Sequence, residues 1–312
     1  MFLTNYPVTS ASLILTASIL GFTVNGFILY RVSTTTMFGR AFGRIWISRC
    51  IGYVVLCGLF AFYLAPAIVI DVSFVQSQWG RRITHIMMLI GNVVIAHTLL
   101  IAINRAVIIS RPLRYKIIFS LSKTYMHIAF VWVICVLVSI PSLIDPCHPT
   151  LVDGDSSFVL GKKECGMLDN VIEVAVPTVI IFLAIIVDVF AIYKIGDVMK
   201  LRKKLQQSPK IPVRCYRSRE GRLCCMIMVQ VITAIFTYVF VISGAFVELE
   251  VLRFLMTTFL WSIVQLLDGL IVIIFIYELR SGVMNGKSNT VTSMTPMSKL
   301  ATRDSFCVSS HN

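Results

Sequence analysis

Charged residues are scarce in this chain, and acidic residues are the scarcest. Only 14% of the 312 residues are Asp, Glu, Lys or Arg, and 15 acidic residues face 28 basic ones, whereas soluble domains carry roughly 25% charged residues. The sequence also contains no P-loop, GxGxxG turn, HExxH helix or CxxC pair. These absences argue against a soluble domain and against the common nucleotide- and metal-dependent enzymes.

Apolar sequence is abundant instead. Hydrophobic residues make up 57% of the chain, and an apolar helix needs about 20 residues to cross a bilayer core of about 30 Å. Seven such runs lie at 8–30, 46–70, 83–104, 125–144, 171–193, 223–247 and 254–277. Glu248, Glu250 and Arg253 predict a loop between the last two runs. The pattern predicts an all-α membrane protein, a bundle of seven transmembrane helices.

Basic residues are concentrated on one side of the predicted membrane. The segments 31–49, 105–123 and 194–222 and the tail hold 4, 5, 10 and 4 of them, 23 of the 28. Because positive residues resist translocation, these segments are predicted to be cytoplasmic, with the N-terminus outside and the C-terminus inside. The net charge of +13 therefore reflects topology, since nucleic-acid binding would need a solvated basic domain.

The chain is predicted to have two parts. Residues 1–280 form the transmembrane domain, and 281–312, rich in Ser, Thr and Met without apolar periodicity, form a disordered cytoplasmic tail. The tail is either a solvated end or a set of phosphorylation sites. The basic 194–222 loop either anchors to anionic lipid or docks a partner.

Two of the nine cysteines, Cys147 and Cys165, fall in the predicted external loop. That compartment is oxidising, so we predict a disulfide between them. Closing this loop would stabilise it by about 3 kcal/mol in the chain-entropy model. Cys224 and Cys225 lie at an inner membrane boundary, where they are either free thiols or palmitoylated.

The most specific motif is Ile103–Tyr115, INRAVIISRPLRY. It resembles the rhodopsin-like receptor motif, in which an acid, an Arg and an aromatic residue precede Pro-Leu-x-Tyr at the same spacing. The resemblance implies that Asn104, Arg105, Pro112 and Tyr115 form a G-protein coupling site, with Arg105 touching the G protein in the active state. Asn104 replaces the usual acid, so the intrahelical ion pair that restrains the Arg cannot form. An Arg that only snorkels to the interface is the alternative.

The seventh run resembles a narrower family, the nematode chemosensory receptors called serpentine receptor class X. The most specific matches are FLMTTFLW from Phe254 and LDGLI from Leu267. Shorter matches extend over about 38–280: Phe42-Gly43, Ser48-Arg49, Ala102-Ile103-Asn104-Arg105, Pro112, Tyr115, Phe119, Cys147 and Cys165. The resemblance implies G-protein-coupled detection of environmental chemicals, in the plasma membrane of the sensory cilia of neurons.

Polar residues of the seventh run are predicted to face the bundle interior. Asp268 facing lipid would cost roughly 3 kcal/mol, so we expect it inside, in a polar switch with Asn25. Gln265 and residues further outward on the same face, with third-run residues about 21 to 27 Å from Arg105, predict an external pocket for a small, mostly apolar ligand with a hydrogen-bonding group. Its residues are Met87, Met88, Gly91, Thr258, Trp261 and Gln265. Ordinary helix packing is the alternative for each.

We therefore predict a chemosensory receptor that binds an odorant- or pheromone-like ligand and activates a heterotrimeric G protein at the cytoplasmic face. The alternative is a multi-pass transporter or ligand-gated ion channel that uses Asp188, Asp268 and His97, although neither repeats nor a polar stripe is evident. A receptor that has lost signalling is a third possibility, since Asn104 and Gly269 stand in place of the usual acid and Pro. No nucleophile with a matched base and no histidine pair with metal spacing is evident, so we predict no enzyme, metal or cofactor.

Overall fold

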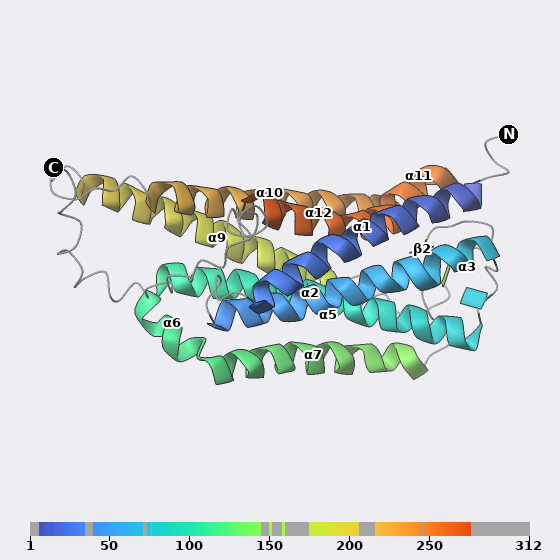
Figure 1. The fold of residues 1–312 in the computed structure, drawn as a ribbon, viewed down its shortest axis with the longest axis horizontal. Helices are drawn as coiled ribbons and strands as arrows, with labels where there is room; N and C mark the ends of the chain where they lie inside the picture. The colour runs from blue at the N-terminus through green and yellow to red at the C-terminus, as the bar shows by residue number, and fades with distance from the viewer. Residues whose placement is uncertain are drawn as a thin grey trace.

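The computed structural model describes residues 6–34, 40–70, 74–75, 77–144, 150–151, 158–159, 175–205, 216–244 and 246–275. Within these residues, seven helices are long and apolar enough to cross a membrane. They run along the long axis of the molecule and form one elongated bundle (Figure 1). The predicted seven-helix membrane fold is confirmed. The Cys147–Cys165 disulfide and the tail at 281–312 lie outside the described residues.

The helices and strands follow the predicted runs in order. The crossings are α1 (Tyr6–Thr34), α2 (Arg40–Leu59) continued by η1 (Phe60–Leu64) and α3 (Ala65–Ile70), α5 (Gln78–Ser110), α7 (Leu121–Ile144), α9 (Val176–Leu205), α10 (Tyr216–Gly244), and α11 (Glu250–Phe254) continued by η3 (Leu255–Phe259) and α12 (Leu260–Phe275). The short helix α6 (Pro112–Ile118) follows α5, and strands β1 (Thr150–Leu151) and β2 (Phe158–Val159) pair antiparallel. Helix α6 lies at one end of the bundle and α3 with β2 at the other, here called the α6 end and the α3 end (Figure 1).

The second crossing contains one π-helical turn, η1. The Ala65 N–H donates to the Phe60 carbonyl, one residue further back than in an α-helix. Pro66 follows directly, and a proline in a helix has no N–H and clashes with the carbonyl four residues earlier, here Phe62. The wider turn accommodates that clash while the crossing stays continuous.

Two predicted loops are shorter in the structure. Glu250 and Arg253 were expected in a loop, but α11 already begins at Glu250, where an acid in the first turn favours the helix dipole. Much of the basic 194–222 segment is also helical, because α9 runs to Leu205 and α10 begins at Tyr216. Eight of the ten basic residues of this segment therefore lie within these two helices.

The third crossing, α5, has defined ends. At its start, the Ser77 side chain accepts a hydrogen bond from the Gly80 N–H at 3.1 Å, as an N-cap residue does. At its end, Pro112 begins α6, since a proline fits the first position of a helix and disfavours helical geometry in the residue before it. The motif that contains Arg105 therefore lies where α5 turns into α6.

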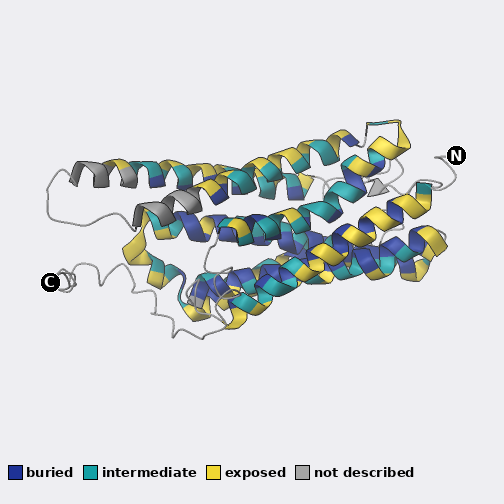
Figure 2. Ribbon diagram, turned by 45° about the horizontal axis from the view of Figure 1, so that its top comes forward, coloured by how far each residue is buried: buried dark blue, intermediate teal, exposed yellow. Residues whose placement is uncertain are grey.

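Burial differs between the inner and outer faces of the helices. Buried residues line the faces where helices meet, and exposed residues line the outer faces (Figure 2). Many exposed side chains are large and apolar, among them Phe130, Phe182 and Phe236. Such a surface suits lipid, so the buried polar residues in the interior are the candidates for function.

Candidate functional site

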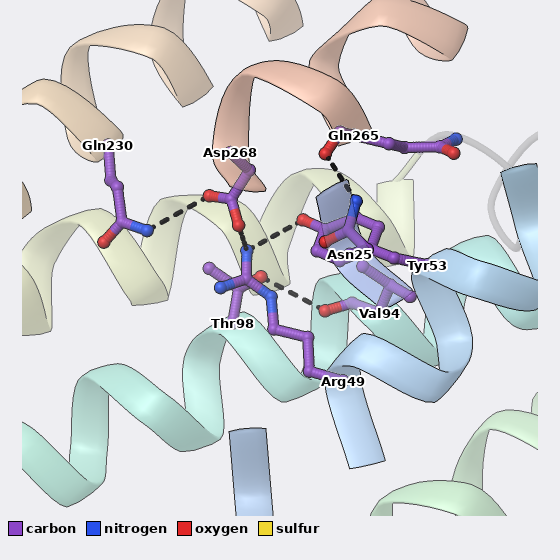
Figure 3. Close-up of polar contacts among 8 residues, drawn as sticks. All are labelled: Asn25, Arg49, Tyr53, Val94, Thr98, Gln230, Gln265 and Asp268. Carbon is purple, nitrogen blue, oxygen red and sulfur yellow. Dashed lines mark hydrogen bonds and ion pairs between the residues drawn. The ribbon is translucent and has the colours of Figure 1, made fainter. Parts of the chain in front are cut away.

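An ion pair between α2 and α12 lies in the middle of the bundle. Arg49 Nη2 is 3.1 Å from Asp268 Oδ2, and both side chains are buried or nearly so. Gln230 on α10 donates to the other Asp268 oxygen at 3.1 Å, and Arg49 donates to the Tyr53 hydroxyl at 2.8 Å (Figure 3). A buried ion pair needs such additional hydrogen bonds to offset its desolvation. The pair therefore connects three helices, α2, α10 and α12.

The sequence of α2 positions Arg49. Trp46, Arg49 and Tyr53 are three and four residues apart, so they share one face of the helix. The Arg49 guanidinium lies 5.3 Å from the Trp46 ring and 5.1 Å from the Tyr53 ring. The faces of aromatic rings attract cations, most strongly where water is excluded. The two rings therefore hold the guanidinium against Asp268.

A second ion pair lies nearer the α6 end. Arg105 Nη1 on α5 is 3.7 Å from Asp188 Oδ1 on α9, and both side chains are buried. The neighbouring Asn104 instead donates to the Tyr115 hydroxyl at 3.4 Å. The acid that pairs with Arg105 is thus supplied by another helix, not by the preceding residue.

Tyr115 connects α6 to α5 and α7. Its ring stacks on Phe119 at 5.6 Å, and Phe119 contacts His127 on α7 at 5.3 Å. Burial raises the pKa of the Tyr115 hydroxyl above its ordinary value, so the group stays protonated and accepts from Asn104 as a neutral oxygen. Pro112 begins the same helix. The four predicted coupling residues therefore lie together at the α6 end.

Asn25 and Asp268 lie in the same layer but have different partners. Asn25 donates to the carbonyl of Gly21 at 2.9 Å. It also donates to the carbonyl of Gln265 at 3.0 Å (Figure 3). A Cβ on Gly269 would lie 2.6 Å from Val24 and 3.3 Å from the Asn25 amide oxygen, closer than side chains pack. Glycine at this position therefore allows α12 to approach α1, which gives Gly269 a packing role.

The predicted ligand-binding residues lie in the α3 half of the bundle. A Cβ on Gly91 would lie 3.1 Å from the Trp261 ring, and Trp261 meets Phe60 edge to face at 5.2 Å. Met87 is buried in the same apolar cluster. Thr258 and Gln265 are also buried, whereas Met88 is half-buried. The structure thus brings Met87, Gly91 and Trp261 together, and their binding of a ligand stays a prediction.

Gln265 links this cluster to the polar centre. Its side-chain nitrogen donates to the Trp261 carbonyl at 3.2 Å, and its side-chain oxygen accepts from the Cys57 thiol at 2.9 Å. Its own carbonyl accepts from Asn25. Asp268 follows one helical turn later. A movement of Trp261 along α12 would therefore reach Asp268 through less than two turns of helix.

Comparison with known proteins decides the family. The model of the family described as "Serpentine type 7TM GPCR chemoreceptor Srx" matches residues 15–275. The chain belongs to this Srx family. "Serpentine receptor class X 45" of Caenorhabditis elegans is 24% identical over 289 residues, which cover 87% of this Srx chain and 80% of the relative. The resemblance to serpentine receptor class X is confirmed, and the Srx chain is a multi-pass membrane protein.

The sequence did not predict three polar residues of this Srx chain in their structural role. Arg49 was part of the family resemblance only, and Gln230 had no predicted role. Asp188 was predicted only as an ion-path residue of the transporter or channel alternative. Their charge or polarity within apolar runs could have indicated an interior position, since such residues need interior partners. In the described part of the Srx chain, no group of three or more His, Cys, Asp and Glu residues is arranged to hold a metal ion.

Proposed function

We propose that this Srx chain is a G-protein-coupled chemosensory receptor. A small odorant- or pheromone-like ligand binds in the α3 half of the bundle, and a heterotrimeric G protein binds at the α6 end around Arg105. Family membership supports this proposal. The observation that carries it is the Arg105–Asp188 pair, which holds the motif's Arg inside the bundle. A resting receptor needs such a restraint, because a ligand acts by shifting an equilibrium between two states.

We infer a path from the ligand to the buried ion pairs. A ligand between Met87, Gly91 and Trp261 would press on the indole, which lies so near Gly91 that an added Cβ would be 3.1 Å from the ring. Displacement of Trp261 would move α12, which also carries Asp268, the partner of Arg49. Packed helices can convert small displacements at one site into larger helix shifts. The ligand would therefore act on the buried ion pairs without touching them.

The proposal includes an orientation and a location. The α6 end carries the basic extensions of α9 and α10, so it faces the cytoplasm according to the positive-inside rule. The α3 end then faces outward, where environmental chemicals arrive. We place the receptor in the plasma membrane of sensory cilia, in line with its chemoreceptor family.

The direct test is GDP–GTP exchange on heterotrimeric G proteins by the reconstituted chain, measured against an odorant panel. We expect ligand-dependent exchange in the parent and none in Arg105→Ala. Arg82→Ala is the matched control, because Arg82 is exposed at the other end of α5 and stacks on Trp79. Ligand-gated ion current without nucleotide exchange would instead favour the channel alternative.

A further inference from the structure

The two buried ion pairs act on one another. The Asp188 carboxylate interacts electrostatically with Arg105 and also with Arg49. Arg105 in turn interacts with Asp188, Arg49 and Asp268. The four charges come from α2, α5, α9 and α12 and sum to zero. In a low-dielectric interior, such charges influence one another, so a change in one pair alters the electrostatic environment of the other.

The two pairs differ in strength. Arg49 and Asp268 are 3.1 Å apart, and Tyr53 and Gln230 supply additional hydrogen bonds. Arg105 and Asp188 are 3.7 Å apart. In the described part of the chain, Asp188 Oδ1, Arg105 Nη1 and Asp268 Oδ2 have no hydrogen-bond partner, but Asp268 Oδ1 accepts from Gln230. The pair that restrains Arg105 is therefore the looser one, because its two atoms lie farther apart and the hydrogen bonds from Tyr53 and Gln230 support only the other pair.

Arg49 has N–H groups available for a second hydrogen-bond acceptor. Within the residues described, neither its Nε nor its Nη1 has a hydrogen-bond partner. A guanidinium carries five N–H groups in a fixed fork, enough to bind two carboxylates at once. Asp188 already lies within its electrostatic reach. Asp188 is thus a candidate second carboxylate partner for Arg49.

A buried carboxylate resists being left without a cation, because its desolvation is then uncompensated. Arg105 is therefore released easily only if another cation takes over Asp188. We propose that Asp188 exchanges Arg105 for Arg49 when the bundle changes state, so that Arg49 bridges Asp188 and Asp268. Movement of α12 loosens the Arg49–Asp268 pair and starts the exchange, while Gln230 keeps its hydrogen bond to Asp268. That the freed Arg105 then meets a G protein depends on the proposed function; the exchange itself does not.

The exchange predicts a competition that can be measured without ligand or G protein. Asp268→Asn removes the strong partner of Arg49, which then takes Asp188 from Arg105 and loosens α5 from α9. Ala191 is fully buried on α9, three residues from Asp188, so an Ala191→Cys background reports this loosening. The readout is modification of position 191 by a small water-soluble thiol reagent, located by peptide mass spectrometry in reconstituted protein.

We expect Asp268→Asn to raise the labelling rate by about fivefold, the low end of coupling between sites. The double variant Arg49→Gln/Asp268→Asn lacks the competing cation and should label like the background. An unchanged rate in Asp268→Asn, or an equal rise in the double variant, would overturn the exchange. Should Asp268→Asn not fold, Tyr53→Phe keeps the ring and loosens Arg49 by one hydrogen bond. A smaller rise is then expected, and no rise counts against the proposal.

Nucleotide exchange on a G protein, measured on the same proteins, separates the two proposals. Labelling that depends on Arg49 without any nucleotide exchange would support the partner exchange and contradict the receptor function. Nucleotide exchange together with labelling that does not depend on Arg49 would support the receptor function and contradict the partner exchange.

Discussion

Arg105 on α5 is paired with Asp188 on α9 across 3.7 Å, although the residue before Arg105 is the uncharged Asn104. The missing intrahelical acid therefore does not leave the Arg unrestrained. The restraint instead connects two helices, so any separation of α5 from α9 breaks it. A pair within one helix would have no such sensitivity to helix movement.

Asp188→Asn should raise ligand-free signalling and lower stability. The substitution leaves Arg105 buried without its anion, which typically costs about 3 kcal/mol or more. We expect ligand-free nucleotide exchange about fivefold above the parent and a lower melting temperature in detergent. Asp197→Asn, nine residues along α9 and half-buried, should change neither. A variant with unaltered ligand-free exchange and normal expression would show that the pair is only structural.

Gly269→Ala should destabilise the bundle, because the added Cβ would lie 2.6 Å from Val24. Overpacking of this kind costs about 1 to 3 kcal/mol. Gly26→Ala is the control, since a Cβ there meets nothing within 4 Å, and alanine favours a helix by up to about 1 kcal/mol over glycine. Thermal unfolding of the purified proteins should move in opposite directions for the two variants. Equal melting temperatures would mean that α1 and α12 separate easily.

Gly91→Ala should weaken the response to ligands. The new methyl group would lie 3.1 Å from the Trp261 ring, so the indole must shift within the predicted binding region. One methylene changes ligand discrimination by roughly 10- to 200-fold, and we expect a loss of potency of about tenfold for odorants that activate the parent. Gly196→Ala, where a Cβ would meet nothing within 4 Å, serves as control. Dose–response curves that coincide for all three proteins would place the ligand elsewhere.

Trp132 anchors α7 to α2 through one hydrogen bond. Its indole N–H donates to the Ser48 hydroxyl at 3.1 Å, and its ring meets His97 edge to face at 6.4 Å. Trp132→Phe and Ser48→Ala should each lower stability, and their effects should not add. Double-mutant cycles for such bonds between membrane helices give about 0.6 kcal/mol. Fully additive losses in the four-protein cycle would contradict this bond.

The sequence predicted the fold well because lipid imposes a simple length and polarity rule on each crossing. Runs of apolar residues identified all seven helices, and charge identified Asp268 as an interior residue. The helix ends were less predictable. The polarity of Glu250 predicts a loop residue, yet Glu250 begins α11. A polar residue at a membrane boundary can lie in a helix as well as in a loop.

The partners within the site could not be predicted. Arg49 pairs with Asp268 across 219 positions of sequence, and Arg105 pairs with Asp188 across 83. The spacing of residues along one helix does not indicate which other helix packs against it. Two basic and two acidic interior residues allow more than one pairing. Only the packing of α2 against α12 and of α5 against α9 selects between them.

The π turns at Phe60–Leu64 and Leu255–Phe259 have a consequence for how the chain tolerates changes of length. Such a turn holds one residue more than an α-helical turn, so its loss restores a regular helix instead of breaking one. A one-residue deletion in a regular helix would rotate everything beyond it by about 100°, whereas deletion of the extra residue of a π turn leaves the rest of the crossing in register. In the second crossing, the turn contains Tyr63, which donates to the Gly80 carbonyl at 2.8 Å. Single-residue insertions and deletions among relatives are therefore expected at these two turns, and to be rare in the uninterrupted helix α5.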